Sequence, residues 1–173
     1  MDVSFVVPAY NEEKSLGQCL KSILAEIGLN PKISAQIIVV NNASADNTKN
    51  IALSFPNVTV VDEPKKGLVF ARAAGAKAAT GNLLAHIDAD CMLPQAWLKT
   101  VMDAFAKDKK LVALSGPHTY YDLSRFQQFL VKIYYGLTFF FYFLNRRIFR
   151  VGSFLQGGEF YYQSRGLETN YRL

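Results

Sequence analysis

Two aspartates separated by one residue, Asp88 and Asp90, are the side chains whose type and spacing point most directly to chemistry. They follow an apolar segment, residues 83–87, that has the length of a buried strand. Two carboxylates at a strand end can face one cation, and Mg²⁺ or Mn²⁺ takes oxygen ligands while keeping positions for substrate phosphates. The pair therefore predicts a divalent-cation site that neutralises charge on a leaving diphosphate. As a bare pattern, Asp-x-Asp also fits a solvated loop.

Other apolar segments end in polar groups as well. The expected strands and the groups that follow them are 3–7 with 8–13, 36–40 with Asn41 and Asn42, and 58–61 with Asp62 and Glu63. In open α/β sheets ligands bind outside the carboxyl ends of the strands. We therefore expect these polar groups to gather at one edge of the sheet with Asp88 and Asp90.

Helical patterns alternate with these strands. Asn11 is expected to cap a first helix that has Glu12 and Glu13 in its first turn, and residues 43–46 should open a second. Further helices are expected at 67–79 and after Pro94, and a last strand at 111–114. Strand alternating with helix predicts an α/β fold with a mostly parallel sheet and helices on both faces.

Composition narrows the class of protein. The chain has 173 residues, 50% hydrophobic and 19% charged, which suits a globular chain and excludes disorder as the main state. Its two cysteines have no metal-binding or disulfide-framework spacing, which favours a reducing compartment. A net charge of +5 favours anionic partners, but the scattered basic residues do not predict nucleic-acid binding. With no secretory leader pattern at its start, we expect a cytoplasmic protein.

Four ordered motifs carry a family resemblance. They are residues 7–13 (VPAYNEE), 40–48 (VNNASADNT), 66–82 with KG, ARAAG and ATGN, and 88–90 (DAD). Together they resemble a family 2 glycosyltransferase of the GT-A fold, a Rossmann-like nucleotide-diphospho-sugar transferase fold. The resemblance covers about residues 3 to 117, with a weaker echo near Gly157 and Gly158.

The resemblance implies inverting transfer of a sugar from a nucleotide-diphosphate donor, with a divalent cation (Mg²⁺ or Mn²⁺). It assigns roles to the following residues: Pro8, Ala9 and Tyr10 line the base pocket, Glu12 lies near the ribose, Asn42 reads the base edge, Arg72 approaches the nucleotide, Asp88 lies by the ribose and metal, and Asp90 ligates the metal directly. Many members have an aspartate where Asn42 stands. Because an amide both donates and accepts, the base preference stays open.

Structural interpretations compete at several of these positions. Glu12 also fits a favourable helix-start charge, and Arg72 a solvated helix face. Asp46 is expected to be a helix cap, His86 a core residue and Cys91 a small packing residue.

Residues 123–144 form an apolar stripe of helical spacing that ends in an aromatic run and then Arg146 and Arg147. The uninterrupted apolar portion is too short to span a bilayer, so an interfacial helix is expected. The protein would then lie peripherally at the inner face of a membrane, near a lipid-linked or polysaccharide acceptor. The alternative is a helix packed over the active-site cleft or against a second subunit.

The end of the chain lacks the acidic pair that usually supplies the family's catalytic base. Glu159 and Glu168 do not match that motif, so no base is assigned. We expect a nucleotide-sugar-binding domain at 1–118 and the start of an acceptor-side region at 119–173, either cut from a longer enzyme or in a natural short form. The alternatives are a non-catalytic nucleotide-sugar-binding module and, less favoured because residues 8–11 lack glycine, a sugar nucleotidyltransferase.

Overall fold

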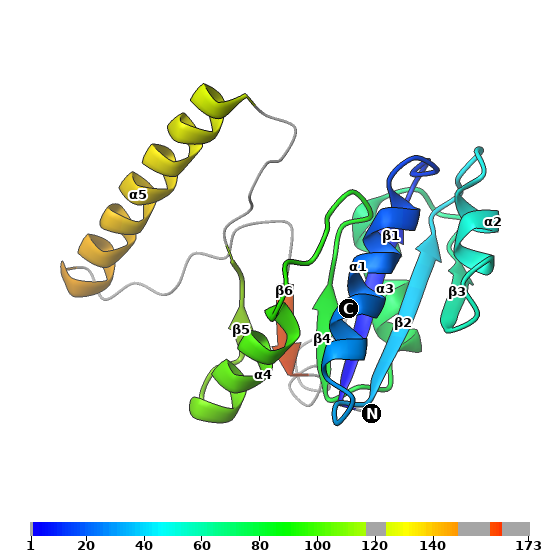
Figure 1. Cartoon of the computed structure of the whole chain (residues 1–173), viewed down its shortest axis with the longest axis horizontal. Coiled ribbons are helices and arrows are strands. Elements are labelled where there is room, and N and C mark those ends of the chain that lie inside the picture. Colours follow the sequence, from blue (N-terminus) through cyan, green and yellow to red (C-terminus); the bar gives the residue numbers. More distant parts are fainter. Residues whose placement is uncertain (1, 117–123, 149–159, 164–173) are drawn as a thin grey trace. The chain divides into compact units, whose positions relative to one another are not determined.

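A computed structural model describes residues 2–116, 124–148 and 160–163 (Figure 1). Its elements are β1 (Val3–Ala9), α1 (Leu16–Leu29), β2 (Ala35–Asn41), α2 (Thr48–Leu53), β3 (Val58–Asp62), α3 (Leu68–Ala78), β4 (Leu83–His86), α4 (Trp97–Lys107), β5 (Ala113–Leu114), α5 (Arg125–Ile148) and β6 (Phe160–Gln163). One compact unit holds the six strands and α1 to α4, and a second holds α5. The boundary expected at 118 lies outside the described residues.

The sheet has the strand order β3-β2-β1-β4-β6-β5. β1 pairs in parallel with β2 and β4, and β2 pairs in parallel with β3. β6 is antiparallel to both β4 and β5. The predicted α/β fold with a mostly parallel sheet is therefore confirmed.

Strand β1 continues through Pro8 to Ala9, past the end expected from the proline. The pairing of β1 with β4 stops at Val6 with His86, whereas its pairing with β2 continues to Ala9 with Asn41. The backbone hydrogen-bonding groups of residues 6 and 8 both point toward β4, because neighbouring residues in a strand alternate in hydrogen-bonding direction. The missing N–H of Pro8 therefore faces the side where the ladder has already ended, and the proline costs no ladder bond.

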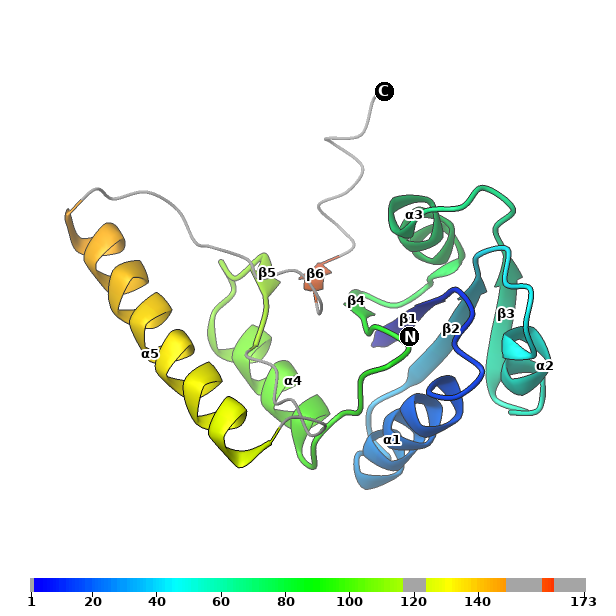
Figure 2. The same ribbon diagram turned by 90° about the horizontal axis from the view of Figure 1, so that it is seen from above.

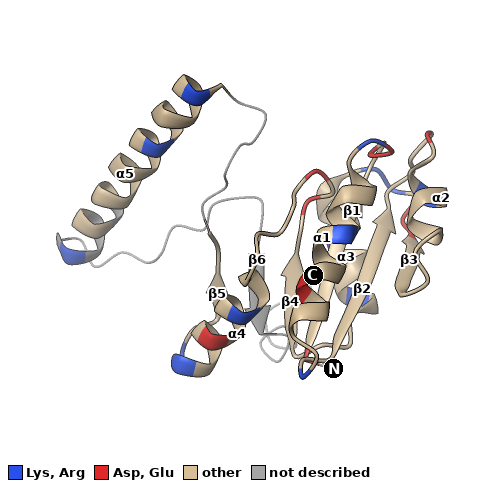
Figure 3. Ribbon diagram, viewed as in Figure 1, with Lys and Arg blue, Asp and Glu red and all other residues tan. Residues whose placement is uncertain are grey.

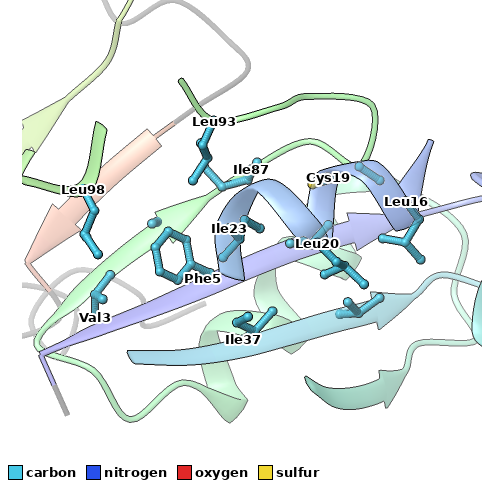
Figure 4. Close-up of a cluster of buried hydrophobic side chains, with 14 of the residues drawn as sticks. Val3, Phe5, Leu16, Cys19, Leu20, Ile23, Ile37, Ile87, Leu93 and Leu98 are labelled. Atoms are coloured by element: carbon cyan, nitrogen blue, oxygen red, sulfur yellow. The ribbon is translucent and has the colours of Figure 1, made fainter. Parts of the chain in front are cut away.

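Helices cover both faces of the sheet, with α3 on one side and α1, α2 and α4 on the other (Figure 2). The larger core lies under α1 and α4 and includes Phe5, Leu20 and Leu98, all fully buried (Figure 4). On the other face α3 approaches closely at Gly75. A Cβ on that residue would lie 2.2 Å from Val6 Cγ1.

The first helix begins at Leu16, four residues later than a cap at Asn11 would place it. Asn11 instead has a positive φ of 56°, which asparagine tolerates better than most residues. Its side-chain oxygen accepts a hydrogen bond from the Ala45 N–H at 2.8 Å. The expected Asn11 cap is therefore wrong, because this side chain joins two loops instead of closing a helix end.

Helix α5 has 24 residues and confirms the helix expected over 123–144, apart from Leu123, which lies outside the described residues. Its described apolar side chains are mostly exposed, Phe126 and Phe139 each at 69%. Its sequence carries basic residues and no acid (Figure 3). No helix in the described part of the chain is long and apolar enough to cross a membrane.

Candidate nucleotide-sugar site

The carboxyl ends of the parallel strands lie at one edge of the sheet, as the sequence predicted (Figure 1). The register aligns Ala9 of β1 with Asn41 of β2, and Asn41 with Asp62 of β3. Asp88 follows β4 by two residues at the same edge. The loops here carry charges of both signs (Figure 3).

Asp88 and Asp90 differ in their surroundings. Asp88 is partly buried, and its Oδ1 accepts a hydrogen bond from Arg72 Nη2 of α3 at 3.1 Å. This contact holds the Arg72 guanidinium at the edge of the sheet, so the residue does not lie on a solvated face. Asp90 is exposed, and the buried Ala89 lies between the two acids. The Asp88 carboxylate is thus paired with the Arg72 guanidinium, and the Asp90 carboxylate faces solvent.

This donor set fits a hard divalent cation. Both side chains offer carboxylate oxygens, and such ions commonly bind through one or two carboxylates plus substrate phosphates. Within residues 2–116, 124–148 and 160–163 there is no group of three or more His, Cys, Asp or Glu side chains placed to hold a metal ion. A cation here would therefore need oxygens from its substrate as well as from Asp88 and Asp90.

Tyr10 is the exposed aromatic side chain at the end of β1, with 47% of its surface accessible. Lys66 Nζ donates a hydrogen bond of 3.0 Å to its hydroxyl and lies 4.9 Å from the ring centroid. This hydrogen bond and the lysine's charge lower the pKa of Tyr10. Pro8 and Ala9 are buried, so they shape the surface under Tyr10 through their backbone.

A second lysine beside an aromatic ring extends this surface. Lys65 Nζ lies 3.8 Å from the centroid of the Phe70 ring. Neither Lys65 nor Lys66 is among the site residues expected from the sequence. Their place just after β3, where the other polar groups converge, was the signal that could have found them.

The Asn42 amide is buried, and both its nitrogen and its oxygen bond to backbone groups of the loop that leads to α3. Its nitrogen donates to the carbonyls of Glu63 at 3.0 Å and Lys65 at 2.7 Å. Its oxygen accepts from the Gly67 N–H at 2.8 Å. Asn42 therefore fixes the course of the loop that carries Lys65 and Lys66.

Glu12 lies where residues 10–13 meet residues 44–48. Its N–H donates to Thr48 Oγ1 at 2.8 Å, and its carboxylate accepts a hydrogen bond from the Ser15 hydroxyl. Asp46 accepts a hydrogen bond from the N–H of Thr48, the first residue of α2, but the N-cap position of that helix is Asn47, one residue later than the expected cap. These bonds tie the loop after β1 to the loop after β2.

The loop that carries Asp88 and Asp90 is held by polar side chains of α1 that sequence reasoning missed. Glu26 is 2% exposed, and its two carboxylate oxygens accept hydrogen bonds from the N–H groups of Ala96 and Leu98, each at 2.9 Å. An acid on the apolar stripe that includes Ile23 and Ile27 was the signal for such a role. His86 is 3% exposed, as expected for a core residue. The segments around Gly157, Glu159 and Glu168 lie outside the described residues.

The model of the family described as glycosyl transferase family 2 matches residues 4–169. The chain belongs to glycosyl transferase family 2. Among curated relatives of this family, it is 32% identical over 102 residues to glycosyltransferase AglE of Haloferax volcanii, which covers 56% of this chain and 33% of the relative. It is 38% identical over 96 residues to a dolichyl-phosphate beta-glucosyltransferase of Trichomonas vaginalis, covering 50% and 28%. The matched part thus spans about a third of each relative.

Solved structures of glycosyltransferases share the fold. The mannosyltransferase PcManGT of Pyrobaculum calidifontis, in complex with GDP-Man and Mn²⁺, has a TM-score of 0.67 at 22% identity and covers 96% of this chain and 45% of its own. Glucosyl-3-phosphoglycerate synthase of Mycobacterium tuberculosis, in complex with UDP, has a TM-score of 0.62 at 18% identity, covering 95% and 57%. The predicted GT-A fold is therefore confirmed.

Proposed function

We propose that this chain binds a nucleotide-diphospho-sugar together with one divalent cation, and that it supplies the donor side of an inverting glycosyl transfer. The observation that carries the proposal is the pair Asp88 and Asp90 at the carboxyl end of β4, one held by Arg72 and the other exposed. Membership of the family supports it. Neighbouring structures hold GDP-Man with Mn²⁺ or UDP, which favours the same class of ligand.

The roles proposed for the site residues follow from their positions. Tyr10 offers an exposed ring for the base, over a floor made by Pro8 and Ala9. Glu12 lies in the loop after β1, two residues from Tyr10, and would bind the ribose through its carboxylate. Because the Asn42 amide is occupied by backbone groups, we propose that it shapes the base pocket through the loop at 63–67.

The charged groups act on the diphosphate. Asp90 and Asp88 would hold Mg²⁺ or Mn²⁺, which when bound neutralises charge on the departing diphosphate. Arg72 keeps the Asp88 carboxylate oriented, and Lys66 adds positive charge at the end of the site near Tyr10. The acceptor hydroxyl must lose a proton to a base, and that base stays unassigned. We propose that residues after 118 begin the acceptor side.

Metal-dependent nucleotide binding tests this function. Isothermal titration of UDP and of GDP, each with Mn²⁺ and with EDTA, should show binding of one nucleotide that requires the metal. Asp90→Asn should abolish Mn²⁺-dependent nucleotide binding, because it removes a charged metal ligand. Asp103→Asn is the control, because Asp103 pairs with Lys99 on the exposed face of α4. An Asp90→Asn variant with undiminished Mn²⁺-dependent affinity would contradict the metal assignment.

We also propose that α5 lies in the surface of a membrane, where a lipid-linked acceptor would be available. The exposed rings of Phe129, Phe140 and Phe143, on a helix with basic residues and no acid, support this placement. Flotation with vesicles of anionic and of zwitterionic lipid is the test, with Phe140→Ser/Phe143→Ser as the weakened variant. Protein that stays at the bottom of the gradient with anionic vesicles would overturn it.

A further inference from the structure

Three side chains on one face of α1 hold the loop that runs from β4 to α4. Cys19, Ser22 and Glu26 are spaced by three and then four residues, so they lie along one side of the helix. Cys19 Sγ lies 3.7 Å from the carbonyl oxygen of Asp88. Ser22 Oγ accepts a hydrogen bond from the Leu93 N–H at 3.0 Å and donates to the Cys19 carbonyl at 2.7 Å.

Glu26 completes this row at the far end of the loop. Its two oxygens accept the N–H groups of Ala96 and Leu98, where α4 begins. Ala96 has a φ of 65°, a left-handed conformation that is unfavourable for a residue with a Cβ and persists only where its surroundings impose it. The buried carboxylate of Glu26 is one group that imposes it.

The position of Asp90 depends on this row of contacts. Asp90 is exposed, and its carboxylate lies 3.7 Å from the thiol of Cys91, a weak donor on the next residue of the same loop. Its direction is therefore set by the backbone of the loop, whose hydrogen bonds at 88, 93, 96 and 98 lead to α1. A ligating group must be held within about 0.5 Å of its working position by such supporting contacts.

We propose that Ser22 and Glu26 are positioning residues for the Asp88–Asp90 pair, which they orient toward the cation through the backbone of the loop. This inference rests on the proposed function, because it assumes that the pair holds a divalent cation. It adds that affinity for the cation is set in part by a helix whose side chains do not themselves reach the metal.

The test compares two serine-to-alanine variants of the same chain. Ser22→Ala removes a hydroxyl that holds the loop at Leu93. Ser4→Ala removes one that holds the amino end of β4, where Ser4 Oγ accepts the Gly81 N–H at 2.9 Å. The apparent dissociation constant for Mn²⁺, in the presence of UDP or of GDP, is measured by electron paramagnetic resonance well below the melting temperature of each variant.

We expect Ser22→Ala to bind Mn²⁺ about tenfold more weakly, the low end for groups that orient a metal ligand. Ser4→Ala should lower the melting temperature but leave the Mn²⁺ affinity unchanged. Ser22→Thr keeps the hydroxyl and should restore the affinity. A merely structural role for Ser22 would lower its melting temperature and leave the Mn²⁺ affinity as it was.

The outcomes separate this inference from the function on which it rests. If the wild-type protein fails to bind Mn²⁺ both with UDP and with GDP, the proposed function is overturned and the inference with it. If the wild-type protein binds Mn²⁺ and Ser22→Ala binds it with the same affinity, the inference alone is overturned. Equal weakening in Ser22→Ala and Ser4→Ala would also overturn it, because the effect would then follow general stability.

Discussion

Replacing Glu26 with glutamine should destabilise the fold far more than its small change in shape suggests. Both carboxylate oxygens of this buried side chain accept backbone N–H groups at the start of α4. An amide keeps one acceptor and turns its NH₂ group toward the other N–H, which leaves a buried donor without a partner at a cost of about 1–3 kcal/mol. Loss of the negative charge at the helix N-terminus adds about 0.3–1 kcal/mol.

The sum predicts a loss of about 2.5 kcal/mol in the free energy of unfolding, taken as the middle of these ranges. For a chain of 173 residues this lowers the melting temperature by roughly 5–10 °C. Urea and thermal unfolding followed by far-UV circular dichroism measure both quantities. Glu13→Gln is the matched control, since exposed Glu13 accepts one backbone hydrogen bond, from Asn47, which an amide oxygen can keep. Equal melting temperatures for Glu26→Gln and Glu13→Gln would refute the reasoning.

Three further predictions test the packing, the loop before α3 and the buried histidine. Gly75→Ala should lower the free energy of unfolding by about 1–3 kcal/mol, because the added Cβ overpacks against Val6. Gly28→Ala in α1, where a Cβ meets nothing within 4 Å, should raise it by about 0.5–1 kcal/mol. Urea unfolding compares the two variants, and equal effects would contradict the close packing at Gly75. Asn42→Asp should lower the free energy of unfolding by about 2 kcal/mol, because a carboxylate cannot donate to the two carbonyls. Asn47→Asp should be neutral in the same assay, because the Asn47 side chain accepts a hydrogen bond from Asn50 through its oxygen. A stable Asn42→Asp variant would show that the loop at 63–67 does not need the Asn42 bonds. Burial and then the charge of Arg72 lower the pKa of His86 to about 4, so the unfolded state binds the proton first and stability should fall between about pH 6.5 and 4, by about 3 kcal/mol in all. His86→Gln should lack this part of the decline, and parallel curves for the two proteins would contradict the prediction.

The sequence predicted most of the fold because apolar periodicity and strand-end chemistry are local signals. The runs at 36–40 and 83–87 became β2 and β4 within one residue of their expected ends, with one residue added to β2 at its start. The start of the first helix was wrong because Asn11 bonds across to Ala45, a contact between segments 34 residues apart that no local pattern encodes. The extension of β1 through Pro8 likewise depends on where β4 stops pairing.

The positions of Asp88 and Asp90 just after β4 were predictable, because the apolar run that precedes them is a local signal. The partner of Asp88 was less visible, because the side chain of Arg72 approaches from a different element, α3. The roles of Ser22 and Glu26 required the three-dimensional path of a loop whose bonded residues lie about 70 positions later in the chain. Asn42 matched a motif position, but only the structure places its amide among the carbonyls of Glu63 and Lys65.

A crystal soaked with Mn²⁺ and either UDP or GDP tests the central claim most directly, through the anomalous signal of the metal. The account predicts one manganese peak bound by Asp90, within reach of Asp88 and of the diphosphate oxygens. A nucleotide bound with no manganese beside these carboxylates, or manganese bound elsewhere on the chain, would contradict it.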